Sequence, residues 1–438
     1  MSFGVYVHIP YCLQRCVYCD FATFEVERIG HSDAALRVDP PEQYVKLVCQ
    51  EIRQRSEEIS TRKIDTLYFG GGTPSLIEPH LILAIIQELR NSGFELCPDA
   101  EATIEINPAT ITEAKLDQYL KMGLNRFSVG VQSFTEAHLQ KMGRKHSAQD
   151  SRETLTLLSK YKTNFNSDLL FALPHQTSEE LKRDIGEMLS FGPSHISPYC
   201  LTVPDKNPMA HSRPSEEHQV KMFEIIHEEL TKADFFRYEI SNYALPGKES
   251  RHNLLYWKDE PYWGLGLSSH SYLRPACLKG LKTRRDRGER GGLLPVGRTS
   301  DPTEQRSIQS FEASWGVRFW NPPTFEAYKN QILHPDLKSE FLGMPSHQFE
   351  FLELHQAITD YCHTALRMSD GLSQKNLKNK FSSETVGSIS DRLNQIDSRL
   401  LTKEERGWKL TEEGLVLSNL VFEKITFLKE DLPSGVLF

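Results

Sequence analysis

Short apolar runs alternate with amphipathic stretches over roughly the first half of the chain. The apolar runs are typical of strands buried on both faces, and the stretches between them carry apolar residues at helical spacing. The predicted strands are Val5–Ile9, Thr66–Phe69, Ala102–Ile106, Arg126–Val131, Phe165–Leu170 and His195–Tyr199. The predicted helices are Glu42–Ser56, Glu78–Asn91, Thr112–Met122, Ala148–Ser159 and Ser178–Leu189.

This alternation predicts an α/β fold in which a parallel sheet is built from strands joined by helical crossovers. Six strand–helix units are too few for a closed eight-fold barrel, so we expect a partial (β/α)6 barrel over residues 1–245. In barrels of this kind, functional side chains lie at the carboxyl ends of the strands. Binding residues are therefore expected in the segments that follow the predicted strands.

The chain changes character beyond the sixth strand. Residues 246–340 form a connecting region with a basic insertion at about residues 275–313, and residues 341–438 form a smaller helical domain. In that domain helices precede a short hairpin at Trp408–Leu410, an order that suggests a winged-helix-like unit. Such units often bind DNA, but this region is not basic as a whole, so a lid or docking role over the barrel mouth is expected instead.

Composition narrows the class of protein. The chain has 438 residues and a net charge of −8, which implies no general affinity for nucleic acid. Its start lacks the pattern of a signal peptide, and no apolar run is long enough to span a membrane. Eight cysteines, three of them clustered near the start, suggest the reducing environment of the cytoplasm.

The clustered cysteines are the strongest chemical signal. Cys12, Cys16 and Cys19 follow the first predicted strand, which Pro10 ends. Three thiolates this close converge on one metal centre; four would close a structural site, whereas three leave one position open for chemistry. Free thiols and a zinc site completed by His8 are alternatives, and disulfides are disfavoured because three is odd. The favoured interpretation is a [4Fe–4S] cluster with one open iron.

This CxxxCxxC spacing resembles the cluster motif of the radical S-adenosylmethionine (SAM) superfamily. The run from Tyr6 to Tyr11, Tyr-Val-His-Ile-Pro-Tyr, resembles the branch that contains oxygen-independent coproporphyrinogen III oxidases and the HemW family of heme chaperones. The resemblance implies the partial barrel, and an open iron that binds the amino and carboxylate groups of SAM. It also implies that an electron from the cluster breaks the sulfonium C–S bond and releases a 5′-deoxyadenosyl radical.

The ends of the later strands carry residues suited to hold SAM. The glycine run at 70–72 lets backbone approach a ligand, although alone it would as often be a turn. Glu105 interrupts an apolar strand, so its carboxylate is expected at the barrel mouth, where it could accept two ribose hydroxyls; a surface glutamate is the alternative. Asp168 lies in an equally apolar strand and should have a partner. By resemblance, the residues at the family's SAM contacts are Tyr6, Tyr18, Gly71, Gly72, Thr73, Glu105, Gln132, Arg144, Asp168 and Thr202.

Two segments depart from the family's usual pattern. The stretch that begins at Asp168 is usually written DLIxGLP, and Ala172 takes the place of its glycine. The turn that begins at Gly264 resembles GxGxGAHS, with Ser268 and Ser269 in place of glycine and alanine. The lost glycine is expected to tighten or reshape that loop.

Two features separate the relatives within the branch. Phe21 stands where coproporphyrinogen oxidases of this class extend the motif to CxxxCxxCxC. The run from His252 to Trp257, His-Asn-x-x-Tyr-Trp, marks HemW-like chains and is tied to heme binding in that family. His252 could ligate heme iron while Tyr256 and Trp257 pack on the macrocycle. A core aromatic patch with a satisfied histidine is the alternative.

The favoured function is a heme chaperone that carries a [4Fe–4S] cluster and SAM, binds heme and delivers it to hemoproteins, including membrane-bound ones. An oxygen-independent coproporphyrinogen III oxidase acting on porphyrinogen propionates is the alternative, and a radical SAM enzyme with another substrate is a third. All imply an electron donor and no nucleic-acid partner. We expect a cytoplasmic protein, peripheral at the inner membrane face. The insertion at 275–313 is a solvated loop by default; an acidic membrane surface, an acidic partner or heme propionates are its other candidate contacts.

Overall fold

The computed structural model describes residues 1–31, 38–279, 314–336 and 341–432. Its centre is a run of strands, each paired in parallel with the next. These strands are β1 (Gly4–Ile9), β4 (Lys63–Gly71), β5 (Glu95–Ile106), β6 (Arg126–Gln132), β7 (Asn164–Phe171) and β8 (His195–Cys200). They cover all six predicted strands, which confirms the α/β fold class and the partial-barrel core.

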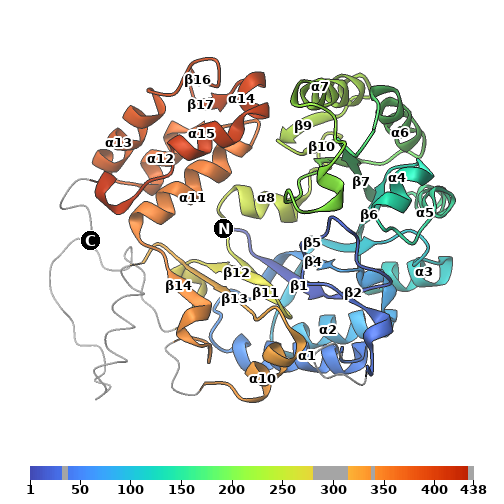
Figure 1. Ribbon diagram of the computed structural model, residues 1–438. Helices are drawn as coiled ribbons and strands as arrows, with labels where there is room; N and C mark the ends of the chain where they lie inside the picture. The colour runs from blue at the N-terminus through green and yellow to red at the C-terminus, as the bar shows by residue number, and fades with distance from the viewer. Residues whose placement is uncertain (32–37, 280–313, 337–340, 433–438) are drawn as a thin grey trace, which may run out of the picture.

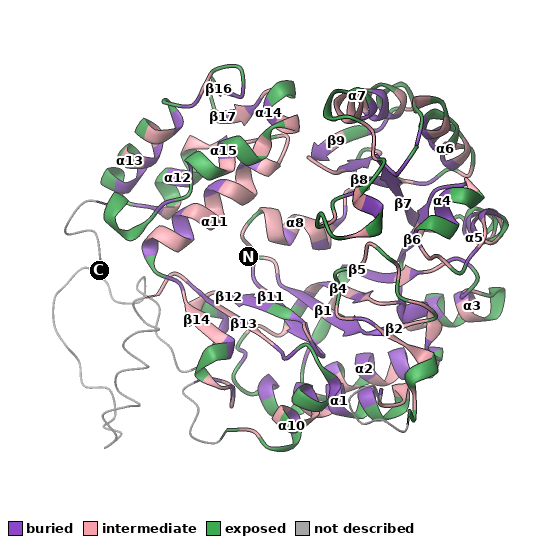
Figure 2. Ribbon diagram, in the orientation of Figure 1, coloured by how far each residue is buried: buried purple, intermediate pink, exposed green. Residues whose placement is uncertain are grey.

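Helices follow these strands and lie along the outer side of the curved sheet (Figure 1). They are α1 (Pro41–Ser56), α2 (Pro79–Asn91), α3 (Glu113–Met122), α4 (Glu136–Lys141), α5 (Ala148–Lys160), α6 (Ser178–Ser190) and α7 (Glu216–Lys232). In α2, Leu81, Ile85 and Leu89 are buried at helical spacing, which holds that face on the sheet. Figure 2 shows the burial concentrated on the strands and on the helix sides that face them. The predicted helices correspond to α1, α2, α3, α5 and α6, whereas α4 and α7 were not predicted.

The helix ends are specified locally. Capping boxes start α5, where Ser147 pairs with Asp150, and α6, where Thr177 pairs with Glu180. Gly123 ends α3 with a φ of 94°, the left-handed conformation that glycine adopts without strain. The N-caps fix where the loops after β6 and β7 end, and Gly123 fixes where the chain turns back toward the sheet to form β6.

Among the described residues the sheet grows to twelve strands, in the order β14-β13-β12-β11-β1-β4-β5-β6-β7-β8-β10-β9. The added strands are β9 (Phe236–Glu239), β10 (Asn242–Ala244), β11 (Tyr262–Leu265), β12 (His270–Leu273), β13 (Val317–Trp320) and β14 (Phe349–Phe351). β1 therefore has two parallel neighbours, β4 and β11. In the cysteine loop, β2 (Tyr11–Cys12) and β3 (Phe24–Glu25) form a separate pair.

The last part of the described chain packs around its own apolar core. Its elements are α11 (Leu354–Arg367), β15 (Leu372–Ser373), α12 (Gln374–Lys380), α13 (Ser383–Leu393), β16 (Leu401–Glu404), β17 (Gly407–Leu410), α14 (Glu412–Val416) and α15 (Ser418–Lys424). Helices followed by a hairpin match the predicted order. An ion pair between Arg367 and the buried Glu239, 2.6 Å from Nε to Oε2, ties this region to the sheet.

Two shorter helices complete the connection between these parts. α8 (Arg251–Trp257) carries the His-Asn-x-x-Tyr-Trp segment and contacts β4 and α11. α10 (Phe325–Leu333) packs on α1. Most of the predicted basic insertion, residues 280–313, lies outside the described residues. Within the described ranges, no helix is long and apolar enough to cross a bilayer.

The two positions where glycine is replaced keep a glycine-like backbone. Ala172 has a φ of 58° and Ser268 a φ of 56°, in the left-handed region that costs a side-chain-bearing residue roughly 1–2 kcal/mol. The family's glycines at these places thus correspond to a backbone requirement. This chain meets it with alanine and serine instead.

Candidate cofactor-binding site

A cavity of about 470 Å³ lies on the inner side of the sheet. It is bounded by the cysteine loop and by side chains from β4 to β8. All of the predicted cluster and SAM residues except Tyr6 line it: Cys12, Cys16, Tyr18, Cys19, Gly71, Gly72, Thr73, Glu105, Gln132, Arg144, Asp168 and Thr202. Residues far apart in the sequence are thus brought to one place, as the strand-end argument predicts.

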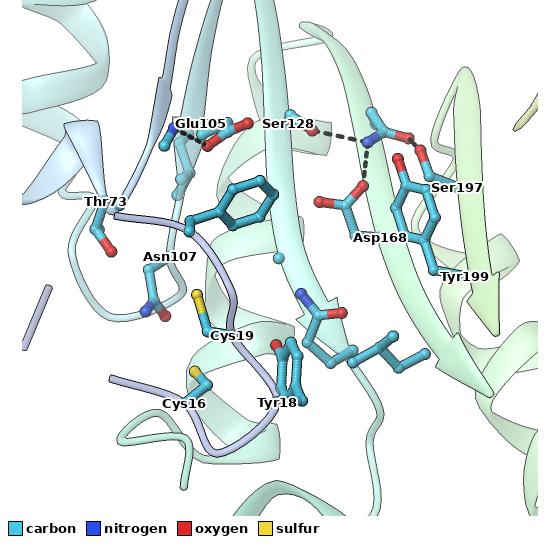
Figure 3. Close-up of a pocket in the computed structure, with 18 of the residues that line it drawn as sticks. Cys16, Tyr18, Cys19, Thr73, Glu105, Asn107, Ser128, Asp168, Ser197 and Tyr199 are labelled. Carbon is cyan, nitrogen blue, oxygen red and sulfur yellow. Dashed lines mark hydrogen bonds between the residues drawn. The ribbon is translucent and has the colours of Figure 1, made fainter. Parts of the chain in front are cut away.

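The cysteine loop is held over the cavity by backbone hydrogen bonds. Phe24 N–H donates to the carbonyl oxygen of Pro10 at 2.8 Å, and Val17 N–H donates to that of Met142 at 3.0 Å. The loop is therefore fixed both to the end of β1 and to the loop after α4. Figure 3 shows Cys16, Tyr18 and Cys19 on this loop, facing the strands across the cavity.

Each of two thiols has a polar neighbour from outside the loop. Thr73 Oγ1 donates to Cys12 Sγ at 3.8 Å, and Arg144 Nη1 donates to Cys16 Sγ at 3.7 Å. Burial raises the pKa of Cys12 to about 11 and also raises the pKa of Cys19. These thiols are therefore protonated at neutral pH, and a metal that binds them must displace their protons.

The donor set fits an iron–sulfur cluster better than a zinc ion completed by His8. Both ring nitrogens of His8 are engaged, Nδ1 with Tyr6 Oη at 3.1 Å and Nε2 with the Ala22 carbonyl oxygen at 3.0 Å. Burial lowers the His8 pKa to about 4. In the described part of the chain, no three His, Cys, Asp or Glu side chains surround a point suited to one metal ion. In a cluster each thiolate binds a different iron, so its sulfurs need not surround one point.

Arg144 adds a second indication that this end of the cavity receives a negatively charged group. Its Nη2 donates to the Gly130 carbonyl oxygen, but its buried Nε has no hydrogen-bond partner among the described residues. A buried donor without a partner is costly unless a ligand satisfies it. The guanidinium beside Cys16 would stabilise thiolates and any bound carboxylate.

The glycine run forms a tight rim at the end of β4. Gly71 has a φ of 107°, and a Cβ there would lie 2.4 Å from the His8 ring. A Cβ on Gly72 would lie 2.7–2.8 Å from the backbone of the cysteine loop. Any side chain at these positions would push the loop away from the strand, so the glycines are what allow β4 and the cysteine loop to meet.

Glu105 points into the cavity from the end of β5, as predicted. Tyr68 Oη donates to its Oε1 at 2.8 Å, and Gly71 N–H donates to its Oε2 at 3.0 Å. Burial raises the pKa of Glu105 to about 7, with the nearby Asp168 charge adding to the rise and the two hydrogen bonds opposing it. The carboxylate is oriented and keeps free lone pairs that can accept ligand hydroxyls.

Asp168 has the partner that its apolar strand required. Asn166 Nδ2 donates to Asp168 Oδ1 at 2.7 Å and to Ser128 Oγ at 2.8 Å, as the dashed lines in Figure 3 show. Burial raises the Asp168 pKa to about 6, although the bonds from Asn166 and Ser197 lower it. Asp168 and Glu105 therefore present two oriented carboxyl groups on the same cavity wall.

His252 and Tyr6 lie next to the cavity but do not line it. His252 is 1% exposed, with Nδ1 bonded to Thr66 Oγ1 at 2.7 Å and Nε2 to Tyr256 Oη at 2.9 Å. Its ring stacks on Tyr68, with centroids 5.0 Å apart, and burial lowers its pKa to about 3. In this conformation it is a satisfied, neutral histidine, and its role as a heme ligand stays a prediction.

The sequence did not predict the floor of the cavity, which is the wall farthest from the cysteine loop. Its side chains are Arg126, Ser128, Asn166, His195, Ser197 and Tyr199. The signal was present: polar residues at every second position, 126 and 128 on β6, 166 and 168 on β7, and 195 and 197 on β8. Alternate residues of a strand share a face, so this pattern places them all on the inner side.

Comparisons with known proteins agree with this geometry. The model of the radical SAM superfamily matches residues 6–188. The heme chaperone HemW of Escherichia coli is 35% identical over 311 residues, covering 69% of this chain and 79% of that protein. HemW of Synechocystis is 38% identical over 62% of this chain and 66% of that protein, and HemW of Lactococcus lactis is 28% identical over 98% of both.

Among solved structures, the coproporphyrinogen III oxidase HemN from Escherichia coli, described as a radical SAM enzyme, has the same fold. It superimposes with a TM-score of 0.74 over 97% of this chain and 90% of its own, at 19% identity. The sequence relatives decide what the fold alone leaves open. The chain belongs to the HemW family of heme chaperones, within the radical SAM superfamily.

Proposed function

We propose that this chain binds heme and passes it to hemoproteins, with a [4Fe–4S] cluster and SAM held in the cavity. The observation that carries the proposal is that three cysteines without disulfide bonds, two oriented carboxyls and an arginine donor with no partner in the described part of the chain meet in one cavity. Heme is proposed as the transported ligand because the relatives in sequence are named as heme chaperones. When bound, the cluster and SAM supply one-electron chemistry at the cavity mouth.

Each group of residues has a proposed task. Cys12, Cys16 and Cys19 hold the cluster, each through one thiolate. Arg144 offers Nε to a carboxylate beside Cys16, and Glu105 and Asp168 accept ligand hydroxyls. Tyr68 holds Glu105 in place through its 2.8 Å hydrogen bond.

Phe21 favours the chaperone over the oxidase. It lines the cavity and is 66% exposed, at the position where oxidases of this class carry a fourth cysteine. An exposed phenyl ring offers a flat apolar surface to a macrocycle and no metal ligand. The fold is shared with an oxidase, so the chemistry of this position carries the distinction.

Heme ligation by His252 is part of the proposal, and it requires the side chain to leave its present hydrogen bonds. The bonds to Thr66 and Tyr256 must break, and the histidine must leave its place beside Tyr68. α8, with seven residues, is short enough for such a local change to be confined to one segment. Heme binding is therefore expected to be slower than simple diffusion into an open site.

The recipients and the electron donor complete the proposal. We expect the chain to work in the cytoplasm, to meet membrane-bound hemoproteins peripherally, and to accept electrons from a reductant protein. Co-sedimentation with inner-membrane vesicles that contain or lack hemoproteins tests the membrane part. Equal sedimentation with both would contradict delivery to a membrane-bound recipient.

The experiment that tests the function is an anaerobic comparison of two tetrapyrroles. The cluster is reconstituted, and heme or coproporphyrinogen III is added with SAM and a reductant. We expect stoichiometric heme binding, transfer to an apo-hemoprotein, and no decarboxylation. Formation of protoporphyrinogen would establish the oxidase instead. 5′-Deoxyadenosine formation without either result would point to another substrate.

A further inference from the structure

On the side away from the cysteine loop, the cavity continues past the predicted SAM residues to a polar floor toward the amino ends of β6 and β8. Arg126 is the first residue of β6 and His195 the first of β8. Both line the cavity together with Ser250 and Asn253, which flank the start of α8. The floor is thus the place where the segment carrying His252 reaches the cavity.

Most polar groups of the floor satisfy one another. His195 Nδ1 lies 2.6 Å from Asn166 Oδ1, and His195 Nε2 lies 2.8 Å from Tyr238 Oη. Burial, reinforced by the Arg126 charge, lowers the pKa of His195 well below its ordinary value, so the ring is neutral. The chain of bonds from Tyr238 through His195 to Asn166 holds these side chains in fixed positions.

Arg126 is the exception. It is 2% exposed, and no described carboxylate lies within ion-pair distance of it. Its guanidinium donates from Nη1 to the Lys248 carbonyl oxygen at 3.2 Å. A buried charge without an ionic partner is expensive. A guanidinium that faces a cavity offers a planar pair of donors, which matches a carboxylate.

The neighbouring side chains are mainly hydrogen-bond donors, and the acidic Asp168 lies outside ion-pair distance although its charge interacts with that of Arg126. Ser128 Oγ and Ser250 Oγ each accept a bond, from Asn166 and from the Asn253 backbone. Neither hydroxyl proton is used toward another described residue, so both can still donate. Asp168 is the acidic group on the adjoining wall, and its Oδ1 is already held by Asn166. The floor is therefore a cationic, donor-rich end to the cavity.

We infer that Arg126 forms a carboxylate-binding subsite that takes a propionate arm of the tetrapyrrole. The inference rests on the proposed function, because heme is the cargo that it supplies. The Lys248 carbonyl bond places Arg126 beside the segment that leads into α8. A heme that engaged the His252 segment from the cavity would therefore meet the part of the wall that Arg126, Ser250 and Asn253 form. Arg126 is a binding residue for the cargo and is separate from the SAM contacts.

The test uses the full-length reconstituted protein and two probes, heme and heme dimethyl ester, titrated by absorbance. We expect the wild type to bind heme at least tenfold more tightly than the diester, about 1.4 kcal/mol. Arg126→Gln should remove that preference by weakening heme and sparing the diester, and Arg126→Lys should keep part of it. Arg152→Gln, which removes a partly exposed arginine on α5 that pairs with Glu187, is the matched control and should change neither affinity.

Each other result is decisive. Equal binding of heme and the diester by the wild type overturns the subsite, and needs no variant that might misfold. Equal weakening of both probes in Arg126→Gln, with iron content and SAM binding intact, would make Arg126 a packing residue. If the wild type binds no heme, the proposed function fails. Coproporphyrinogen III and its tetramethyl ester then replace the probes, and equal binding of those two, or none, overturns the subsite as well.

Discussion

The cysteine loop and the His252 segment were both expected to bind metal, yet the structure leaves them in opposite states. The cysteine loop faces a cavity, and nearby Arg144 keeps a buried donor that no described residue accepts from. His252 is buried, with both ring nitrogens bonded and its ring stacked on Tyr68. One region is open and incomplete, whereas the other is closed and satisfied.

The difference separates a site that can bind a ligand without rearrangement from one that must rearrange before it can bind. Buried polar groups are nearly always paired in folded proteins, so a buried donor beside a cavity that has no protein partner is available to a ligand. A fully paired group can bind a ligand only after giving up its partners, and that exchange reduces the affinity. The proposed cluster site can receive its cofactor as it stands, whereas the proposed ligation of heme by His252 would first need a change of conformation.

The largest effect is expected from removing one thiol of the cysteine loop, which tests whether this loop binds the cluster. Cys12→Ser, Cys16→Ser or Cys19→Ser should each abolish nearly all bound iron and sulfide and, with them, SAM cleavage, because the cluster needs every thiolate. Iron and sulfide assays after anaerobic reconstitution measure this. Cys97→Ser, near the surface and away from the cavity, is the control and should load fully. Full loading of a loop variant would show that the loop is not the cluster site.

The next test asks whether His252 can act as a ligand at all. His252→Gln keeps hydrogen-bonding groups near Thr66 and Tyr256 but should lower heme affinity at least tenfold, about 1.4 kcal/mol. SAM binding and iron content should be unchanged, since His252 does not line the cavity. Absorbance titration with heme gives the affinity. Unchanged heme affinity would reduce this residue to core packing.

A third prediction concerns Glu105 and tests whether its carboxylate contributes to SAM binding in the cavity. If ligand hydroxyls donate to it, the ionised form binds SAM better, so affinity should rise as the pH rises through its pKa of about 7. Glu105→Gln should retain the cluster, lower SAM affinity by about tenfold, as expected for a hydrogen bond to a charged group, and remove that part of the pH dependence. Calorimetry on both proteins at several pH values measures it. Normal SAM affinity in the variant would remove Glu105 from the site.

The smallest expected effect is an increase in heme affinity, whereas the preceding variants are expected to lose binding. Thr66→Val removes the partner of His252 Nδ1 and should destabilise the chain by about 1–3 kcal/mol, because a buried nitrogen loses its hydrogen bond. If His252 must be released to bind heme, the same variant should bind heme a few-fold more tightly. Thr66→Ser, which keeps the hydroxyl, is the control. Weaker heme binding in Thr66→Val would contradict release of His252.

The strand and helix pattern predicted the core of the fold well, because apolar runs and helical periodicity are local. All six predicted strands, and five helices, lie where the pattern placed them. The flanking strands β11–β14 escaped because they are short and rich in aromatic residues, and because long connections separate β12 from β13 and β13 from β14. Their pairing depends on which sheet edge is free, and that is a tertiary property.

The cavity was predicted from its rim and missed at its floor. Cysteine spacing and strand-end glycines identified the rim, whereas Arg126 and His195 begin their strands, where no functional residue was expected. The hydrogen bonds of His252 could not be foreseen either. Thr66 is 186 residues away in the sequence, and only the packing of α8 on β4 brings the two together.

The pairing of β1 with β11 has a consequence for synthesis. β1 leaves the ribosome long before its partner β11, which follows more than 250 residues later, with Gly4 opposite Tyr262. A non-local contact of this kind forms late, so the strand that carries the cysteine loop has one open edge until β11 has been made. We expect cluster insertion to follow completion of the sheet, and nascent chains truncated before β11 to need a chaperone to stay unaggregated.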